Sequence, residues 1–168
     1  LWCWGSSTSC SSSNPVSSGA TYVASTSSAF AALMDDGSVI AFGSSTNGGS
    51  IYYNGNPSDV ASGVVNIFGG DDVFAALKDN GQVVTWGASS YGGVTSSVDS
   101  MISSLCTDVK STYYSFAALR SNGEVIAWGS SSYGGVLSNA IPSGFQAKAL
   151  YSNFRSFCAI LTTNTQVY

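Results

Sequence analysis

Few side chains in this 168-residue sequence could carry out a reaction. The chain contains no histidine, which removes the usual general base, the usual partner of a nucleophilic serine or cysteine, and the commonest metal ligand. Serine is abundant, but no Gly-x-Ser-x-Gly nucleophile elbow occurs. Asp99 and Glu124 are isolated in the sequence and offer no visible carboxylate pair for glycoside hydrolysis. We therefore expect no enzyme, no catalytic residues and no cofactor.

Two acidic pairs are the candidates for binding a metal ion. Asp35–Asp36 and Asp71–Asp72 could attract calcium, but neither pair lies in a stretch that resembles an EF-hand loop. Asp36 precedes Gly37 and is explained by a tight turn. The sequence therefore predicts no metal site.

Aromatic residues at recurring positions are better candidates for binding a ligand. Trp86 and Trp128 could stack against sugars, although a Trp at a fixed place in a strand is typical of a core. Tyr91 and Tyr133 each follow two small residues and precede Gly-Gly, in what we expect to be an exposed turn. Their rings could also simply pack over the glycines. These four residues are our candidates for ligand binding.

The four cysteines, Cys3, Cys10, Cys106 and Cys158, are even in number and form no Cys-x-x-Cys pair. We expect disulfides, and therefore an oxidising compartment, although the sequence does not choose among the three possible pairings. The Ser-rich composition, the scarcity of Lys and the acidic pI of about 4.2 are typical of the same environment. Together they predict an extracellular or cell-surface protein.

Charge and hydropathy exclude two classes of partner. Five basic residues against nine acidic ones are too few to neutralise a nucleic-acid backbone. No apolar run approaches the roughly 18 residues that a membrane span needs. The length fits a single domain over residues 1–168.

An internal repeat organises the chain. Phe30–Gly49, Phe74–Gly93 and Phe116–Gly135 are three copies of one pattern, and a fourth copy begins at Cys158 and stops at the chain end. The missing half of that copy matches LWCWGSS at the N-terminus. The spacings predict four units of about 42 residues, one of them split between the termini. Their bounds are 1–12 with 148–168, 20–50, 64–94 and 106–136.

Each copy predicts a β-hairpin. Phe-Ala-Ala-Leu is followed by Asp-Gly or Asn-Gly and then by a Val-rich run, which is a strong hairpin signal. A further apolar residue seven positions earlier indicates a third strand in each unit, and Pro57 and Pro142 leave little room for helix. We therefore expect an all-β fold.

The run A-L-x-x-(D/N)-G-x-V-x-x-W-G-x-x-x-Y-G resembles the repeats of the regulator-of-chromosome-condensation family. The resemblance covers the hairpin half of each unit and implies a β-propeller, with a role in protein interaction. The units are shorter than those of the family, Gly-Gly replaces its usual Gly-Gln, and the surface is acidic and Lys-poor. The resemblance therefore implies the architecture, and we do not extend it to nucleotide exchange.

The split unit leaves two architectures open, a propeller-like ring and an open solenoid. The terminal strands that would complete it are Leu1, Trp2, Cys3 and Trp4 at one end and Gln166, Val167 and Tyr168 at the other. They could pair within one chain or between chains. By repeat register, Cys158 takes the place of Phe30 and Cys3 that of Ala41, so a Cys3–Cys158 disulfide could close the unit.

Three classes of function follow from these features. The leading prediction is a structural protein that associates with itself into a filament, coat or surface appendage. The second is a lectin-like propeller that binds glycans through its repeated Tyr and Trp residues. The third is a protein-interaction propeller, as the family resemblance implies.

Overall fold

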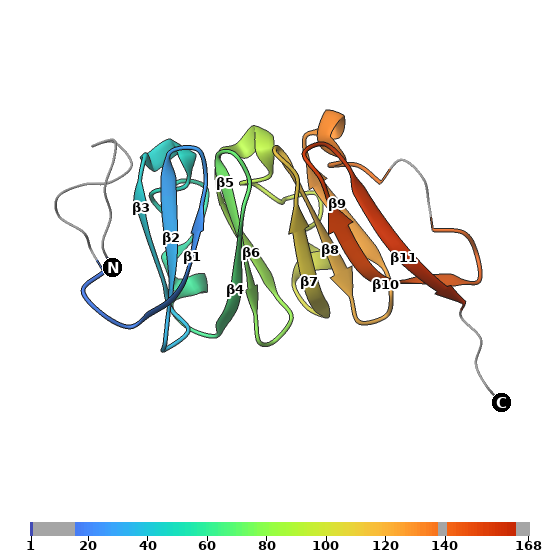
Figure 1. Ribbon diagram of the computed structural model, residues 1–168, viewed down its shortest axis with the longest axis horizontal. Helices are drawn as coiled ribbons and strands as arrows, with labels where there is room; N and C mark the ends of the chain where they lie inside the picture. Colours follow the sequence, from blue (N-terminus) through green and yellow to red (C-terminus); the bar gives the residue numbers. More distant parts are fainter. Residues whose placement is uncertain (2–15, 138–140, 164–168) are drawn as a thin grey trace.

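The computed structural model describes residue 1 and residues 16–137 and 141–163. Eleven strands in these residues form four antiparallel sheets that stand side by side in an open row, with the first and fourth sheets at its two ends (Figure 1). The first sheet contains β1 (Ala20–Ser25), β2 (Ala29–Met34) and β3 (Val39–Gly43); the second β4 (Val64–Gly69), β5 (Val73–Lys78) and β6 (Val83–Gly87); the third β7 (Cys106–Ser111), β8 (Ser115–Arg120) and β9 (Val125–Gly129); the fourth β10 (Phe145–Ser152) and β11 (Phe157–Thr163).

Adjacent sheets pack through the same elements each time. The first strands contact one another in the order β1, β4, β7 and β10, and the hairpin of each sheet faces the next sheet. One short helix, α1 (Asp99–Ile102), lies between the second and third sheets in the sequence. The all-β, propeller-like arrangement predicted from the repeat is therefore confirmed.

The hairpin turns form as the Asp-Gly and Asn-Gly pairs predict. The side-chain oxygens of Asp36, Asn80 and Asn122 each accept a hydrogen bond from the backbone N–H two residues later, at 2.9–3.1 Å. Hydrogen bonds from the side chain and then the backbone of Ser38 lower the pKa of the Asp36 carboxyl, because they stabilise the charged form. These local bonds show that Asp36 serves a turn.

The repeated spacing of Phe and Trp places two aromatic rings against each other in the hairpins of the second and third sheets. Phe74 stacks on Trp86 with ring centroids 5.3 Å apart, and Phe116 stacks on Trp128 at 5.6 Å. The Trp86 indole Nε1 donates to the Gly48 carbonyl oxygen of the preceding sheet at 2.9 Å. The exposed fractions of Trp86 and Trp128 are 0% and 3%, so both rings belong to the core between sheets.

Packing explains both residues of the Gly-Gly motif. Gly48 has φ +91°, and a Cβ there would lie 2.6 Å from Cδ2 of Phe74 in the next sheet. A Cβ on Gly49 would lie 2.5 Å from the Gly43 carbonyl carbon within its own sheet. The first glycine therefore allows adjacent sheets to approach, and the second allows the turn to fold back on its own strand.

The fourth sheet corrects the predicted register by one residue. Phe157 pairs with Ser152 as Phe116 pairs with Ser111, so Phe157, and not Cys158, is the equivalent of Phe30. The exposed fraction of Leu150 is 2%, whereas that of Tyr151, the residue we had aligned with the buried Val109, is 54%. The last unit is thus one residue shorter, and the slip exchanges which side chains face inward.

The closure predicted for the split unit falls mostly outside the described residues. These exclude Trp2, Cys3 and Trp4 as well as Gln166, Val167 and Tyr168. The Leu1 amino group donates to the Val16 carbonyl oxygen at 3.2 Å. The corrected register changes the expected cysteine geometry, because Cys158 now takes the place of Ala117, which pairs directly with Ala127.

Candidate functional site

One long edge of the row of sheets, the upper edge in Figure 1, carries a continuous set of turns, which we call the turn face. It consists of the turns that follow the first strand of each sheet and the 3-10 turns that follow the third strands. The former are Thr26–Ser28, Gly70–Asp72, Thr112–Tyr114 and Asn153–Ser156; the latter are η1 (Ser45–Asn47), η3 (Ser89–Tyr91) and η4 (Ser131–Tyr133). Thr26 Oγ1 donates to the Asn47 carbonyl oxygen at 2.9 Å, and Thr112 Oγ1 donates to that of Tyr133 at 2.9 Å.

Main-chain hydrogen bonds join these turns from sheet to sheet. The Ser27 N–H donates to the Asp71 carbonyl oxygen at 2.7 Å, the Asp71 N–H to that of Tyr113 at 2.8 Å, and the Tyr113 N–H to that of Phe154 at 3.1 Å. We call this series the backbone ladder. It places four equivalent positions next to one another although more than 40 residues separate each from the next in the sequence.

A second set of equivalent contacts joins each 3-10 turn to the next sheet. The Asn47 amide donates to the Asp72 carboxylate between the first and second sheets. At the same place between the second and third sheets, Tyr91 stacks on Tyr114 with ring centroids 4.0 Å apart. Between the third and fourth sheets, the Arg155 guanidinium lies 5.1 Å from the Tyr133 ring centroid. One geometry therefore holds an amide–carboxylate pair, a ring stack and a cation–π pair.

The turns after the first strands and the 3-10 turns together form an aromatic cluster, which we call the tyrosine cluster. The ring centroid of Tyr113 lies 4.5 Å from that of Tyr114 and 4.6 Å from that of Phe154, and the Tyr133 ring meets Tyr114 edge-on with centroids 4.7 Å apart. The exposed fraction of Phe154 is 56%, and the other rings are partly exposed. Its members are Tyr91, Tyr113, Tyr114, Tyr133 and Phe154.

Two carboxylates border the tyrosine cluster. A hydrogen bond to Asp71 is the main reason that the pKa of the Tyr113 phenol is raised. Burial, followed by the neighbouring Tyr91, raises the pKa of Tyr114 to about 12. Asp72 also accepts from Ser27 Oγ at 3.0 Å. The two phenols are therefore neutral hydrogen-bond donors at physiological pH, next to negative charge.

A shallow cavity of about 520 Å³ runs along the turn face beside this cluster. Its lining combines main-chain and small polar atoms with one carboxylate and two rings, from turns of all four sheets. The residues that matter here are Thr26, Gly70, Asp71, Tyr113, Asn153 and Phe154. Such a lining can stack against a flat group and accept hydrogen bonds, but it contains no nucleophile paired with a base.

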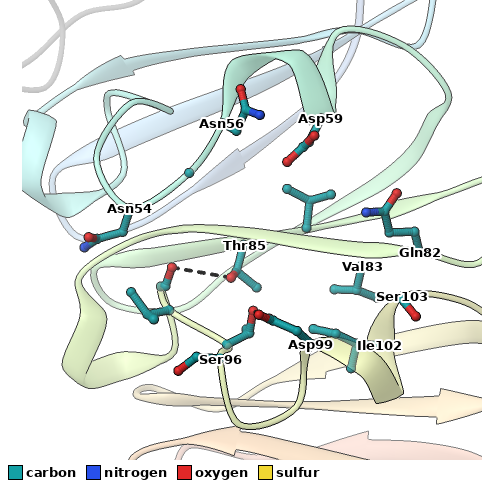
Figure 2. A pocket seen from close by; sticks show the side chains of 15 residues that line it. Asn54, Asn56, Asp59, Gln82, Val83, Thr85, Ser96, Asp99, Ile102 and Ser103 are labelled. Atoms are coloured by element: carbon teal, nitrogen blue, oxygen red, sulfur yellow. Dashed lines mark hydrogen bonds between the residues drawn. The ribbon is translucent and has the colours of Figure 1, made fainter.

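A second cavity of about 550 Å³ lies beside the hairpin of the second sheet (Figure 2). Its wall carries Asp59 from the 3-10 turn η2 (Pro57–Val60) and Asp99 from the start of α1, together with Gln82 and Thr85. Asp99 already accepts a hydrogen bond from Thr95, and Thr85 Oγ1 donates to the Gly93 carbonyl oxygen at 3.5 Å. In the described parts of the chain, no three His, Cys, Asp or Glu side chains gather as a metal site would require. We assign no chemistry to this cavity.

The structure separates the four residues predicted to bind ligand. Tyr91 and Tyr133 both contact Tyr114 on the turn face. Trp86 and Trp128 are buried, so the prediction that they form surface platforms for sugars is wrong: the preceding sheet covers their rings. Sequence reasoning missed Tyr113, Tyr114, Phe154 and Arg155, although Tyr113-Tyr114 stands where the first sheet has Ser27-Ser28.

The structure describes two of the four cysteines, and both are free thiols. Cys106 is buried at the start of β7, and Cys158 is exposed on β11. Burial raises the pKa of the Cys106 thiol, which lowers its thiolate fraction at neutral pH. Cys3 and Cys10 lie outside the described residues. Cys158 therefore forms no disulfide in this structure.

The two thiols should differ sharply in reactivity. We expect Ellman's reagent at pH 8 to modify Cys158 within minutes and to leave Cys106 unmodified until the protein unfolds, because only the thiolate of an accessible cysteine reacts. Peptide mapping after a timed quench would identify each site, with Cys158→Ser as the control. Modification of Cys106 at the rate of Cys158 in the native protein would contradict the burial described here.

The comparisons with known proteins agree with this architecture. Residues 106–134 match the family model described as the Regulator of chromosome condensation (RCC1) repeat, and no curated protein matches the sequence. Human WBSCR16 has a similar structure, with a TM-score of 0.59 and 18% identity over 88% of this chain and 46% of that chain. Prp20p of Saccharomyces cerevisiae has a TM-score of 0.56 and 16% identity, over 80% of this chain and 39% of that chain. The ectodomain of the Physcomitrella patens receptor kinase CR4 has a TM-score of 0.54 and 17% identity, over 86% of this chain and 36% of that chain. The chain thus spans less than half the length of these proteins.

The predicted extracellular or cell-surface location is corrected by this comparison. WBSCR16 and Prp20p, the latter also described as yeast RCC1, are more similar to this chain than the CR4 ectodomain is, and they do not support that location. Low charge and many small residues are explained instead by close packing between sheets. No helix in the described residues is long and apolar enough to cross a bilayer. The family match to the third unit and the shared architecture lead to one conclusion: the chain is built from RCC1-type β-propeller repeats.

Proposed function

We propose that this chain is a protein-interaction domain and that the turn face, with the tyrosine cluster at its centre, is its binding surface. The observation that carries the proposal is the gathering of five partly exposed aromatic rings from three sheets at one edge of the fold. Tyrosine is enriched at the energetic centres of protein interfaces, because it offers a large rigid contact area and a hydroxyl group. The rings are held by the backbone ladder, so binding would cost little ordering of the surface.

The related structures support interaction over the other two classes. Prp20p has described binding properties towards Gsp1p and histones, and its complex with Kap60 has been solved. Nothing in the described residues supports a filament or a lectin: the two tryptophans are buried, and the terminal strands fall mainly outside the description. We likewise propose a non-catalytic role, because the cavities hold no pair of reacting groups.

The repeat itself supplies variants for testing this proposal. Tyr91→Asn, Tyr113→Ser and Tyr114→Ser replace three rings by the residues that the first sheet carries at equivalent places, Asn47, Ser27 and Ser28. We expect the triple variant to keep its circular dichroism spectrum and to lose at least tenfold in affinity, because it removes a large contact area.

Biolayer interferometry of the chain against Gsp1p and against core histones would measure that loss. Tyr22→Ser is the matched control, since Tyr22 is an exposed tyrosine on β1 outside the turn face. The proposal requires saturable binding to at least one of these proteins that only the triple variant weakens. Binding that both variants retain would place the interaction elsewhere on the fold.

A further inference from the structure

The chain already holds one cation against the tyrosine cluster. The guanidinium carbon of Arg155 lies 5.1 Å from the Tyr133 ring centroid and 5.9 Å from that of Phe154. Both distances are within the range at which a guanidinium is attracted by the face of an aromatic ring. Arg155 is itself exposed, so it occupies this place from the solvent side.

The charges around the cluster favour a cation. Asp71 and Asp72 are the acidic residues of the turn face, and Arg155 is the only basic residue in its turns. The chain as a whole has a formal net charge of −4. The negative charges of Asp71 and Asp72 also contribute to the raised pKa of the Tyr113 phenol, because both carboxylates lie in the turn beside it.

The Asp71 carboxylate and the rings of Tyr113 and Phe154 are placed so that a single group of a bound partner could contact both. Asp71, Tyr113 and Phe154 line the same 520 Å³ cavity, and Asp71 is the main cause of the raised pKa of the Tyr113 phenol. A planar guanidinium can stack on an aromatic ring and direct its N–H fork at a carboxylate, whereas the compact ammonium of lysine can do so only as a point charge. The arrangement is therefore suited to arginine more than to lysine.

From this geometry we infer that the turn face receives an arginine-bearing basic segment of a partner protein, with an arginine side chain stacked on the tyrosine cluster and paired with Asp71. The inference rests on the proposed function, because it names the partner chemistry of the same surface. It also assigns Arg155 a role: its guanidinium competes for the rings and repels the incoming cation. Removing that side chain should strengthen binding.

Fluorescence polarisation with labelled nona-arginine and nona-lysine peptides, titrated with the 168-residue chain, would test the inference. We expect nona-arginine to bind at least fivefold more tightly than nona-lysine. Asp71→Asn should weaken nona-arginine binding at least fivefold, while Asp35→Asn, which changes the net charge equally in a hairpin turn outside the turn face, should weaken it less than twofold. Arg155→Gln should strengthen it about threefold, and the triple tyrosine variant should abolish the preference for arginine.

Each arm can overturn the inference. Equal losses of affinity for Asp71→Asn and Asp35→Asn would show that the peptide is attracted by net charge alone. Equal affinity for the two peptides would contradict stacking of arginine on the tyrosine cluster. Weaker binding by Arg155→Gln would contradict the role assigned to Arg155 as a competitor. If Gsp1p or histones bind through the turn face while nona-arginine does not, the proposed function stands and this inference fails. If the peptides behave as expected while neither protein binds, the turn face is an arginine-binding surface and the proposed function fails for Gsp1p and histones.

Discussion

Replacing Trp86 with alanine should lower the free energy of unfolding by about 3–5 kcal/mol. The ring is fully buried between the first and second sheets, stacks on Phe74, and donates its N–H to the Gly48 carbonyl oxygen. The substitution leaves a cavity and an unpaired carbonyl at a junction between two sheets. Because single domains are stabilised by about 5–15 kcal/mol in total, this loss is a large fraction of the free energy of unfolding. Urea unfolding followed by circular dichroism would measure the change.

The first sheet provides the matched control for this experiment. Phe42 occupies the position of Trp86 there and stacks on Phe30 at 5.5 Å, so the fold accepts phenylalanine at this place. Trp86→Phe should therefore cost only about 1–2 kcal/mol, from the lost hydrogen bond and some lost contact area. A Trp86→Ala protein that unfolds at the same urea concentration as the wild type would show that the ring does not hold the two sheets together.

Replacing Gly48 with alanine should cost about 2–5 kcal/mol. The left-handed backbone at φ +91° opposes any Cβ, and this one would also overlap the Phe74 ring, which is fully buried and has no room to move. Differential scanning calorimetry of the purified variant would measure the loss of stability as a lower melting temperature.

Gly144 separates the two causes of that loss. Its φ is +84°, but nothing lies within 4 Å of the place where a Cβ would stand. Gly144→Ala should therefore carry only the backbone cost, about 1–2 kcal/mol. Equal destabilisation by the two substitutions would mean that the contact between Gly48 and Phe74 does not limit how closely the sheets approach.

Most of the fold could be predicted from the sequence because its signals are local. Asn-Gly and Asp-Gly pairs specify their turns through bonds that span two residues, as Asn80 shows. The alternation around Phe-Ala-Ala-Leu specifies the strands and their buried faces. The error at Cys158 arose where these signals fail, because the last unit lacks the Asp-Gly or Asn-Gly pair that fixes the alignment elsewhere.

The candidate site was only half predictable. Tyr91 and Tyr133 stood out because they recur at one repeat position, whereas Tyr113, Tyr114, Phe154 and Arg155 occupy positions that differ from unit to unit. Their proximity depends on hydrogen bonds between separate sheets, such as that from Tyr113 to Phe154. The tryptophans gave the opposite error: recurrence marked a core position, where a large aromatic ring packs against the preceding sheet.

The backbone ladder has an evolutionary consequence. It is made entirely of main-chain atoms, so its hydrogen bonds place no requirement on the side chains at its four positions, Ser27, Asp71, Tyr113 and Phe154. A hydroxyl, a carboxylate, a phenol and a phenyl ring accordingly occupy one backbone geometry. Mutation can therefore rewrite what this edge of the molecule recognises, one turn at a time, without disturbing the scaffold beneath it, as hypervariable loops do on a constant framework.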